Sequence, residues 1–438
     1  MKFCTVTLGC KVNQFETQAI ESVLVSRGHT LQKPGGGCDV CVINTCTVTA
    51  ESARKSRQAV RHAKKLEPGA LIAVCGCFSQ LEPITAKSIG ADLVGGTGDR
   101  QGFALEVEKL AGAGTRTHAG AHTQAGAMEL SMPRRTRGLL KIQDGCDNYC
   151  AYCIVPYARG GSRSLALQAA AEHARTLGES GYREIVITGI EISSYGKDLP
   201  GNPSLTDVVR EIGKSAPDAR LRLGSLDPGA MTEDLCRELQ TIENLCCHFH
   251  LSLQSGCDET LRRMGRKYDT REVLSAIIRL RSCFPDCGVT ADLITGFPEE
   301  TEREFEQTLT FIKTAAFSGM HVFPYSPRPG TAAAGMPGKV ARSVRQERAR
   351  AASAVAAEMA EDFKRCQTGK TRDVLFERKR DGYWTGHSDN YIEVAVKSGG
   401  ARNMRHPVRI TAVSDGTVWG EIMGLQSSLS GPTPGQAL

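Results

Sequence analysis

The chain of 438 residues is too long for one ordinary domain, and its 40% hydrophobic and 23% charged content is typical of a globular protein. No apolar run is long enough to span a bilayer, and the N-terminus lacks the apolar core and cleavage site of a signal peptide. We therefore expect a cytoplasmic protein with no membrane partner, in which 17 cysteines do not form a disulfide framework. A net charge of +6 permits binding to a polyanion without requiring it.

The first part of the chain, residues 1–111, alternates strands and helices, which predicts a parallel sheet covered on both faces. Strands are expected at residues 2–7, 40–44, 71–74 and 93–94. Helices are expected at residues 17–27, 52–65, 83–89 and 103–110.

Cysteines stand at the carboxyl ends of three of these strands, at Cys10, Cys46 and Cys77. The carboxyl ends of neighbouring parallel strands lie together, so the three thiols can converge as ligands of an iron–sulfur cluster. We prefer Cys77 to the nearby Cys75 because Cys77 reaches the loop. The alternative is that these are ordinary buried apolar cysteines.

Residues 112–131 have almost no large apolar side chains, which predicts a linker. A second alternation over residues 132–366 then predicts a partial (β/α)6 barrel, two units short of a full barrel. Its strands are expected at residues 139–142, 184–188, 220–224, 248–253, 289–294 and 320–323. Loops rich in Gly and Pro leave the strand ends on the side where barrel enzymes build their active sites.

Three cysteines follow the first barrel strand in the run D-G-C-D-N-Y-C-A-Y-C, at Cys146, Cys150 and Cys153. A closed structural zinc site takes four protein ligands, so three thiolates favour a [4Fe-4S] cluster with one open iron. The spacing resembles that of radical S-adenosylmethionine (SAM) enzymes. That resemblance implies that SAM binds the open iron and supplies a 5′-deoxyadenosyl radical, which makes these three cysteines the catalytic centre. It also implies that Tyr149 and Tyr152 shield the cluster.

The same resemblance points to residues that bind SAM. D-L-I-T-G-F-P-E resembles the adenine-binding motif of these enzymes, and T-G-I-E stands where they contact the amino group, although Gly-Gly-Glu is commoner there. The candidates are Thr188, Glu191, Ser225, Ser252, Gln254, Asp292, Gly296 and Pro298. The two serines and the glutamine are equally consistent with stabilising turns. Arg159 and Arg163 are consistent with contacts to a substrate or cofactor carboxylate, and equally with surface positions.

After a long helix expected over residues 342–367, residues 367–430 predict a small antiparallel barrel. Its strands are expected at residues 373–377, 391–396, 408–413 and 418–422. Basic residues crowd the last hundred positions, which is equally consistent with solvated surfaces and with a nucleic-acid-binding face. The candidate RNA-binding side chains are Arg378, Lys379, Arg380, Tyr383, Trp384 and Tyr391. The fold class expected for the whole chain is α/β multidomain.

Two three-cysteine sites followed by a small barrel resemble the radical SAM methylthiotransferases over almost the whole chain. The resemblance implies two [4Fe-4S] clusters and SAM as cofactors, with Cys10, Cys46 and Cys77 holding the cluster that carries the sulfur. It further implies that the C-terminal barrel is an RNA-binding TRAM domain. The partners it implies are a tRNA anticodon stem-loop, an electron donor such as flavodoxin or ferredoxin, and a sulfur source.

Within that family, T-L-G-C-K-V-N-Q-F-E-T is similar to the branch that methylthiolates carbon 2 of threonylcarbamoyladenosine, next to the tRNA anticodon. The isopentenyladenosine branch usually reads G-C-Q-M-N here, and the branch that modifies an aspartate of a ribosomal protein usually reads L-G-C-x-K-N. Both stay open as alternatives. An RNA-binding protein with structural or redox-sensing clusters is the non-enzymatic alternative, and the strand-end loops argue against it.

Overall fold

The computed structural model describes residues 1–112 and 136–424 of the chain. Its contacts define two compact units, Met1–Met359 and Ala360–Leu438. Nearly all of the expected linker lies outside the described residues. Within those residues, no helix combines the length and the apolar character needed to cross a membrane.

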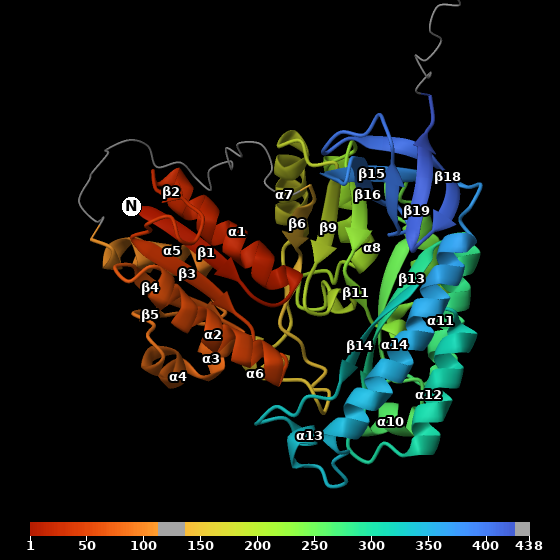
Figure 1. The fold of residues 1–438 in the computed structure, drawn as a ribbon, viewed down its shortest axis with the longest axis horizontal. Coiled ribbons are helices and arrows are strands. Elements are labelled where there is room, and N and C mark those ends of the chain that lie inside the picture. The colour runs from red at the N-terminus through yellow and green to blue at the C-terminus, as the bar shows by residue number, and fades with distance from the viewer. Residues whose placement is uncertain (113–135, 425–438) are drawn as a thin grey trace, which may run out of the picture. The chain divides into compact units, whose positions relative to one another are not determined.

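The first sheet of unit 1 has five parallel strands in the order β2-β1-β3-β4-β5 (Figure 1). The strands are β1 Lys2–Thr7, β2 Thr30–Leu31, β3 Val40–Thr45, β4 Leu71–Gly76 and β5 Leu93–Val94. The helices are α1 Lys11–Ser26, α2 Ala50–Leu66, α3 Cys77–Leu81, α4 Pro83–Ser88 and α5 Arg100–Leu110. The predicted alternation is confirmed, and β2 and α3 are additions to it.

Helices cover both faces of this sheet because its central strands are apolar on both sides. Phe3 and Val42 pack on the face that α1 and α5 cover, whereas Cys41 and Ile43 pack on the face that α2 covers. Thr49 forms a capping box with Ser52 at the start of α2. The carboxyl ends of β1, β3 and β4 therefore lie side by side at one edge of a rigid layer.

The second α/β layer of unit 1 contains the six predicted barrel strands. They are β6 Gly138–Lys141, β9 Glu184–Thr188, β10 Arg220–Leu223, β12 His248–Gln254, β13 Gly288–Thr295 and β14 Gly319–Pro324. They form two parallel sheets, β10-β9-β6 and β11-β12-β13-β14, and β11 (Ser225–Leu226) follows β10 after Gly224 alone. This arrangement is the partial barrel expected from the sequence.

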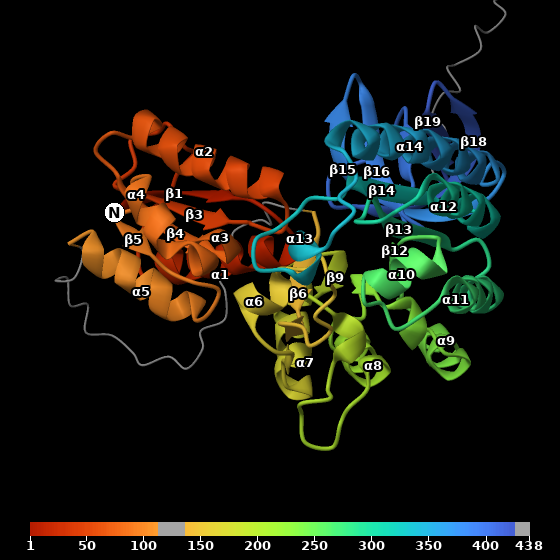
Figure 2. The same ribbon diagram turned by 90° about the horizontal axis from the view of Figure 1, so that it is seen from below.

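Helices surround the outside of these strands, as Figure 2 shows. They are α7 Leu167–Glu179, α8 Leu205–Ser215, α9 Glu233–Gln240, α10 Asp258–Arg263, α11 Thr270–Cys283 and α12 Glu302–Ala315. Apolar strand residues such as Phe249, Leu251 and Leu293 are buried in the core beneath them. The alternate side chains of β12 and β13 point to the other face of the sheet, inside the partial barrel.

Shorter elements frame the three-cysteine loop and the strand ends. They are the hairpin strands β7 Gln143–Asp144 and β8 Arg163–Ser164, helix α6 Val155–Arg159, helix α13 Ala332–Gly335, and the 3₁₀ turns Ile192–Ser194 and Pro228–Ala230. Helix α14, Arg342–Arg365, begins in unit 1 and ends in unit 2, close to the expected bounds.

Unit 2 contains a closed barrel with strand order β15-β16-β17-β19-β18. Its strands are β15 Thr371–Arg380, β16 Tyr383–Ser388, β17 Glu393–Val396, β18 Arg405–Ser414 and β19 Thr417–Ile422. Val374, Phe376, Val394 and Ile410 contribute to its own apolar core. The small barrel is as predicted, except that β16 occupies a stretch that we expected to be a loop.

Candidate active site

Cys146, Cys150 and Cys153 lie on the loop between β7 and α6. The backbone N–H of Asn148 donates to Cys146 Sγ at 3.5 Å. Burial, together with the charges of Cys150 and Cys146, raises the pKa of Cys153 to about 12. Burial also raises the pKa of Cys146. The Cys146 and Cys153 thiols therefore lie in a desolvated place that favours their protonated form unless a metal centre binds them as thiolates.

Cys10, Cys46 and Cys77 also converge, at the carboxyl edge of the first sheet. Gly9 has a φ of +100°, and a Cβ there would lie 2.8 Å from Cys46 Cβ and 3.0 Å from its Sγ, so only glycine lets the two segments approach. Burial raises the pKa of Cys77 to about 12, and the charges of Cys46 and Cys10 add to that effect. The structure thus brings together the three cysteines that were predicted from their positions at strand ends.

Cys75 takes no part in this second triad. It is fully buried and belongs to the apolar core between the first sheet and helices α1 and α5. Burial raises the pKa of this thiol to about 12. Its place in the apolar core supports the choice of Cys77, at the start of α3, as the third member of the triad.

Both triads suit a cluster better than a single ion. Among the described residues, the group of His, Cys, Asp and Glu side chains with all ligand atoms within 4.8 Å of one another is His250, Asp292 and His321, which contains no cysteine. A four-iron cluster spaces its thiolates more widely than one metal ion does. Three sulfur donors at each site are the ligands that iron–sulfur clusters take.

Arg266 is a residue of the site that sequence reasoning missed. Its Nη1 donates to Cys150 Sγ at 3.1 Å, and its Nη2 donates to Asp227 Oδ2 at 2.9 Å. The guanidinium also lies 4.7 Å from the centre of the Tyr268 ring, and only 6% of the side chain is exposed. Arg266 therefore places a buried positive charge on Cys150, one of the three predicted cluster ligands. Arg266 lies in the loop after α10. That loop contains no cysteine and no strand-end motif that would have identified Arg266 from the sequence.

Glu191 and Thr188 lie at the end of β9, beside the three-cysteine loop. Gln143 Oε1 accepts the backbone N–H of Glu191 at 2.8 Å and so fixes the turn. Burial raises the pKa of Glu191 to about 7, and the nearby Asp227 carboxylate adds to the rise. A buried carboxylate with this unfavourable charge balance fits a cationic partner such as the amino group of SAM.

The other SAM candidates are spread along three strands. Ser225 begins β11, and Gln254 ends β12 with a φ of +69°. The backbone oxygen of Ser252 accepts the hydroxyl of Tyr268. These contacts explain the local turns and leave the SAM role of these side chains a prediction.

The G-F-P loop is positioned by protein contacts. Gly296 has a φ of +70°, and a Cβ there would lie 2.2 Å from Cγ of Arg345 in α14. Arg345 thus packs closely against this glycine, and adenine binding by the loop stays a prediction. Phe297 packs with Tyr325 and Met264, a cluster that Tyr152 also joins, so the loop and the three-cysteine segment share one apolar contact.

The other residues predicted for this region are the SAM candidates Pro298 and Asp292 and the predicted cluster shields Tyr152 and Tyr149. Pro298 is buried beside that apolar contact, and Asp292 lies four residues before Gly296, where its carboxylate meets two histidines. Tyr152 is partly buried, as expected for a shield. Tyr149 is 56% exposed and packs edge-on against Tyr157 at a centroid distance of 5.8 Å.

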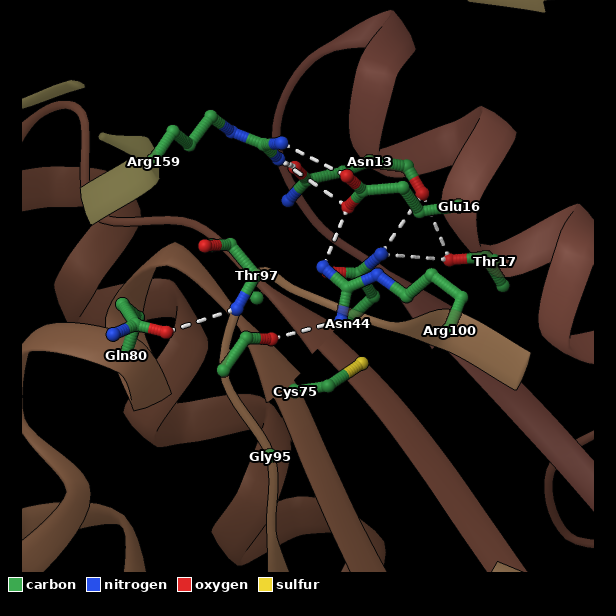
Figure 3. Close-up of polar contacts among 12 residues, drawn as sticks. Asn13, Glu16, Thr17, Asn44, Cys75, Gln80, Gly95, Thr97, Arg100 and Arg159 are labelled. Atoms are coloured by element: carbon green, nitrogen blue, oxygen red, sulfur yellow. Dashed lines mark hydrogen bonds and ion pairs between the residues drawn. The ribbon is translucent and has the colours of Figure 1, made fainter. Parts of the chain in front are cut away.

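A buried ion-pair network around Glu16 and Arg159, drawn in Figure 3, lies between the segments that carry the two triads. Arg159, the last residue of α6, donates from Nη1 to Glu16 Oε1 at 2.8 Å. The same nitrogen donates to Asp144 Oδ1 at 2.9 Å. Its Nη2 donates to Asn13 Oδ1 at 2.7 Å. Arg100 donates to Glu16 Oε2 at 2.7 Å.

This network corrects the expectation for Arg159. Its side chain is 1% exposed, so it is neither a surface arginine nor the ligand of a substrate carboxylate. The Arg159 charge also lowers the pKa of Cys77 and Cys10, against the larger effect of burial. Arg159 therefore fixes the segment that follows Cys146, Cys150 and Cys153 to the first turns of α1, which follow Cys10.

The candidate RNA-binding side chains lie on unit 2. Arg378, Lys379 and Arg380 are exposed at the end of β15. Tyr391 is 36% exposed, whereas Trp384 is partly buried against the barrel core and Tyr383 packs edge-on against Trp419. The basic residues and Tyr391 are thus the members of this set that solvent reaches most easily.

Two family models match this chain. Residues 140–312 match the Radical SAM superfamily, and residues 2–96 match a family described as Uncharacterized protein family UPF0004. The chain is 35% identical over 408 residues to a threonylcarbamoyladenosine tRNA methylthiotransferase MtaB of Bacillus subtilis (strain 168), with 89% of each chain covered. It is 34% identical to the protein of that name from Thermotoga maritima, with 93% of this chain and 94% of that one covered.

A differently named relative is similar at slightly lower identity. A tRNA-2-methylthio-N(6)-dimethylallyladenosine synthase of Desulfotalea psychrophila is 31% identical, with 96% of this chain and 98% of that one covered. Among solved structures, the radical S-adenosylmethionine methyltransferase TsrM from Kitasatospora setae matches with a TM-score of 0.54 at 12% identity, covering 74% of this chain and 76% of that one. That likeness shows the fold alone.

Proposed function

Because this chain belongs to the methylthiotransferase family of radical SAM enzymes, we propose that it transfers a methylthio group to carbon 2 of threonylcarbamoyladenosine in tRNA. Membership makes it a transferase whose cofactors are [4Fe-4S] clusters and SAM. The substrate is supported by five relatives named for threonylcarbamoyladenosine at 32–35% identity, whereas those named for dimethylallyladenosine are 30–31% identical.

The observation that carries the proposal is the presence of two cysteine triads held in one compact unit by the Arg159 network. When bound at Cys146, Cys150 and Cys153, the cluster and SAM supply a radical able to take a hydrogen atom from a C–H bond. Glu191 holds the amino group of SAM, Arg266 orients Cys150, and the apolar contacts of Phe297 exclude water. Cys10, Cys46 and Cys77 hold the second cluster, to which sulfur is delivered.

The partners follow from this chemistry. A base beside the anticodon is already unpaired, so reaching it costs little unstacking. The exposed basic residues of the C-terminal barrel bind the phosphates of the anticodon stem, in the manner of a TRAM domain. A flavodoxin or ferredoxin supplies electrons, a separate donor supplies sulfur, and the tRNA substrate places the enzyme in the cytoplasm.

Mass spectrometry of tRNA nucleosides from cells with and without this gene tests the proposal. We expect that cells without the gene lose 2-methylthio-threonylcarbamoyladenosine and accumulate the base without the methylthio group. Loss of the isopentenyl counterpart instead would assign the enzyme to the other tRNA branch. If all tRNA nucleosides are unchanged, the proposal is wrong, and ribosomal-protein side chains become the substrate to examine.

Single substitutions separate the two cysteine triads. Cys150→Ala should abolish reductive cleavage of SAM, because it removes a ligand of the cluster that binds SAM. Cys46→Ala should stop methylthiolation while SAM cleavage continues, because the other triad is intact. The readouts are 5′-deoxyadenosine and methylthiolated RNA from one reaction. Methylthio transfer by the Cys46 variant would contradict the role given to the second triad.

A further inference from the structure

Asn13, in the first turn of α1, holds two of the loops that carry the second cysteine triad. The residue is buried, and its Nδ2 donates to the backbone oxygen of Leu8 at 2.8 Å and to that of Thr45 at 3.0 Å. Leu8 lies two residues before Cys10, and Thr45 directly precedes Cys46. One side-chain amide therefore fixes the distance between the turn after β1 and the end of β3.

The third loop of the triad is tied to the same place. The hydroxyl of Thr45 donates to the backbone oxygen of Cys75 at 2.6 Å and accepts the backbone N–H of Ser79 at 3.4 Å. Cys77 lies between these two residues in the chain, directly after β4. The three cysteine loops thus have hydrogen bonds either to Asn13 or to its partner Thr45.

The oxygen of the same amide lies between Cys10 and Arg159. It accepts from the Cys10 thiol, whose Sγ is 3.8 Å away, and from Nη2 of Arg159 at 2.7 Å (Figure 3). Both amide hydrogens already point at backbone oxygens, so the orientation of the Asn13 amide is fixed. When Cys10 binds iron as a thiolate it has no proton to donate, and Arg159 remains the donor to this oxygen.

The ion pairs around Arg159 leave an excess of positive charge. Its guanidinium pairs with the carboxylates of Glu16 and Asp144. The same carboxylates pair with Arg100 and Lys141, so three cations share two carboxylates. The Arg159 side chain is buried, and buried charge that is not balanced is costly. A four-iron cluster on three thiolates carries a net negative charge and would balance this excess.

We propose that Asn13 and Arg159 are positioning residues of the cluster held by the second triad. Asn13 fixes the separation of the cysteine loops, and Arg159 balances the charge of the cluster beside the shared amide oxygen. This inference rests on the proposed function, which gives the second triad a cluster. Arg159 follows the other three-cysteine loop in the chain, so the structure gives it a role at the cluster that the neighbouring cysteines do not bind.

The charge of Arg159 is tested in full-length protein in which Cys146, Cys150 and Cys153 are all replaced by alanine, so that only the second triad binds a cluster. In this parent, Arg159→Gln keeps a hydrogen-bond donor and removes the charge. The midpoint potential of the cluster should fall by at least about 60 mV, a ten-fold change for one electron, because a nearby positive charge favours the reduced state. Arg159→Lys should recover part of the potential. The measurement is a redox titration followed by electron paramagnetic resonance.

Arg100→Gln is the matched control for this charge. It removes a cation from the same carboxylate, and the hydrogen bonds of its guanidinium go to Gly96 and Glu16 rather than to Asn13. It should shift the potential less than Arg159→Gln does. If Arg159→Gln leaves the potential unchanged, or if Arg100→Gln lowers it as much, the role given to Arg159 is wrong.

Asn13→Asp tests the contacts to the cysteine loops in the same parent. The carboxylate has the shape of the amide but cannot donate to the backbone oxygens of Leu8 and Thr45. A chelator should therefore remove iron from the reconstituted cluster at least about ten-fold faster, since loss of a residue that orients metal ligands costs about 10–100-fold in metal affinity. Gln18→Glu makes the same amide-to-acid change further along α1 and should keep the parent rate.

The outcomes separate this inference from the proposed function. Iron loss from Asn13→Asp at the parent rate would contradict the role of Asn13, while a cluster at the second triad would leave the proposed function standing. A parent protein that binds no four-iron cluster would overturn the inference together with the role that the proposed function gives to the second triad.

Discussion

Arg266 gives the three-cysteine loop an electrostatic control that the cysteines alone do not provide. Its guanidinium touches Cys150 Sγ at 3.1 Å and is held from behind by Asp227. Hydrogen bonds and positive charge at a cluster sulfur favour the reduced state, and they are strongest where water is excluded. With a cluster bound at Cys146, Cys150 and Cys153, Arg266 would act through Cys150 as a positioning residue and make that cluster easier to reduce.

Arg266→Met, which keeps the apolar stem and removes the charge, should lower the reduction potential of the cluster at Cys146, Cys150 and Cys153. We expect SAM cleavage with a weak reductant to fall at least about ten-fold, and to recover in part with a stronger one. The potential is measured by a redox titration followed by electron paramagnetic resonance. Arg266→Lys should recover part of the potential because it restores a positive charge.

The control for this prediction is Lys267→Met, one residue further along, where the side chain is exposed. It should leave both the potential and SAM cleavage unchanged. A potential for Arg266→Met equal to that of the wild type would show that the contact with Cys150 is only structural.

For single site residues, the sequence predicts the positions that strand ends and cysteine spacing determine, and few others. Cys10, Cys46 and Cys77 were predictable because parallel strands bring their carboxyl ends together. Arg266 was not, because its approach to Cys150 depends on how a loop after α10 folds back. The contact between Gly296 and Arg345 was not predictable for a similar reason, since Arg345 comes from a helix about fifty residues later.

The elements around Arg159 lock the first sheet to the partial barrel within unit 1. Glu16 on α1 accepts from Arg159, from Arg100 on α5 and from Lys141 on β6. The cationic partners hold the pKa of Glu16 and of Asp144 below the usual range, against the effect of burial. Removing one member of a buried ion pair leaves the others without compensation, at a cost of about 3–5 kcal/mol.

Glu16→Gln should therefore loosen the contact between α1 and the segment after the three-cysteine loop. Hydrogen exchange of full-length protein should show easier opening of the first turns of α1, with the free energy of opening lower by about 3 kcal/mol or more. Glu21→Gln, on the same helix, is the control and should change this region much less. Unchanged exchange in the Glu16 variant would mean that the network adds nothing to this contact.

The sign of the pH dependence follows from the lowered pKa values of Glu16 and Asp144. The two carboxylates contribute to the stability of this contact. That contribution is fully present above about pH 4.5, the ordinary carboxyl range, and is lost as the pH falls through the lowered pKa values of the folded state. Wild-type protein should thus show faster exchange in α1 on acidification, after correction for the intrinsic rate. The Glu16→Gln variant should respond less.

The strands and helices themselves were mostly visible in the sequence, because alternation and chain length define them. The main exception is β16, whose run Y-W-T-G-H-S has few apolar residues and a glycine. Gly386 lies against the backbone oxygen of Leu375 on β15, so the strand exists because its neighbour pairs with it. Tertiary pairing of this kind has no signal in a single strand.

The whole molecule combines two units with separate cores, and this separation suggests that chemistry and RNA binding belong to different units. Unit 1 contains both cysteine triads, whereas the barrel of unit 2 contains no residue proposed for chemistry. Arg378, Lys379 and Arg380 are exposed at the end of β15, beyond the part of the strand that forms the core. Exposed cations at such a position contribute little to stability and are suited to binding phosphates.

Neutralising Lys379 and Arg380 together, as Lys379→Gln with Arg380→Gln, should weaken binding of full-length protein to a tRNA anticodon stem-loop. Each lost phosphate contact releases about one counterion fewer, so the slope of log K against log salt should become shallower by about two. SAM cleavage without RNA serves as the check on unit 1, and Lys214→Gln on α8 serves as the surface-charge control. An unchanged slope would remove this end of the barrel from the RNA contact.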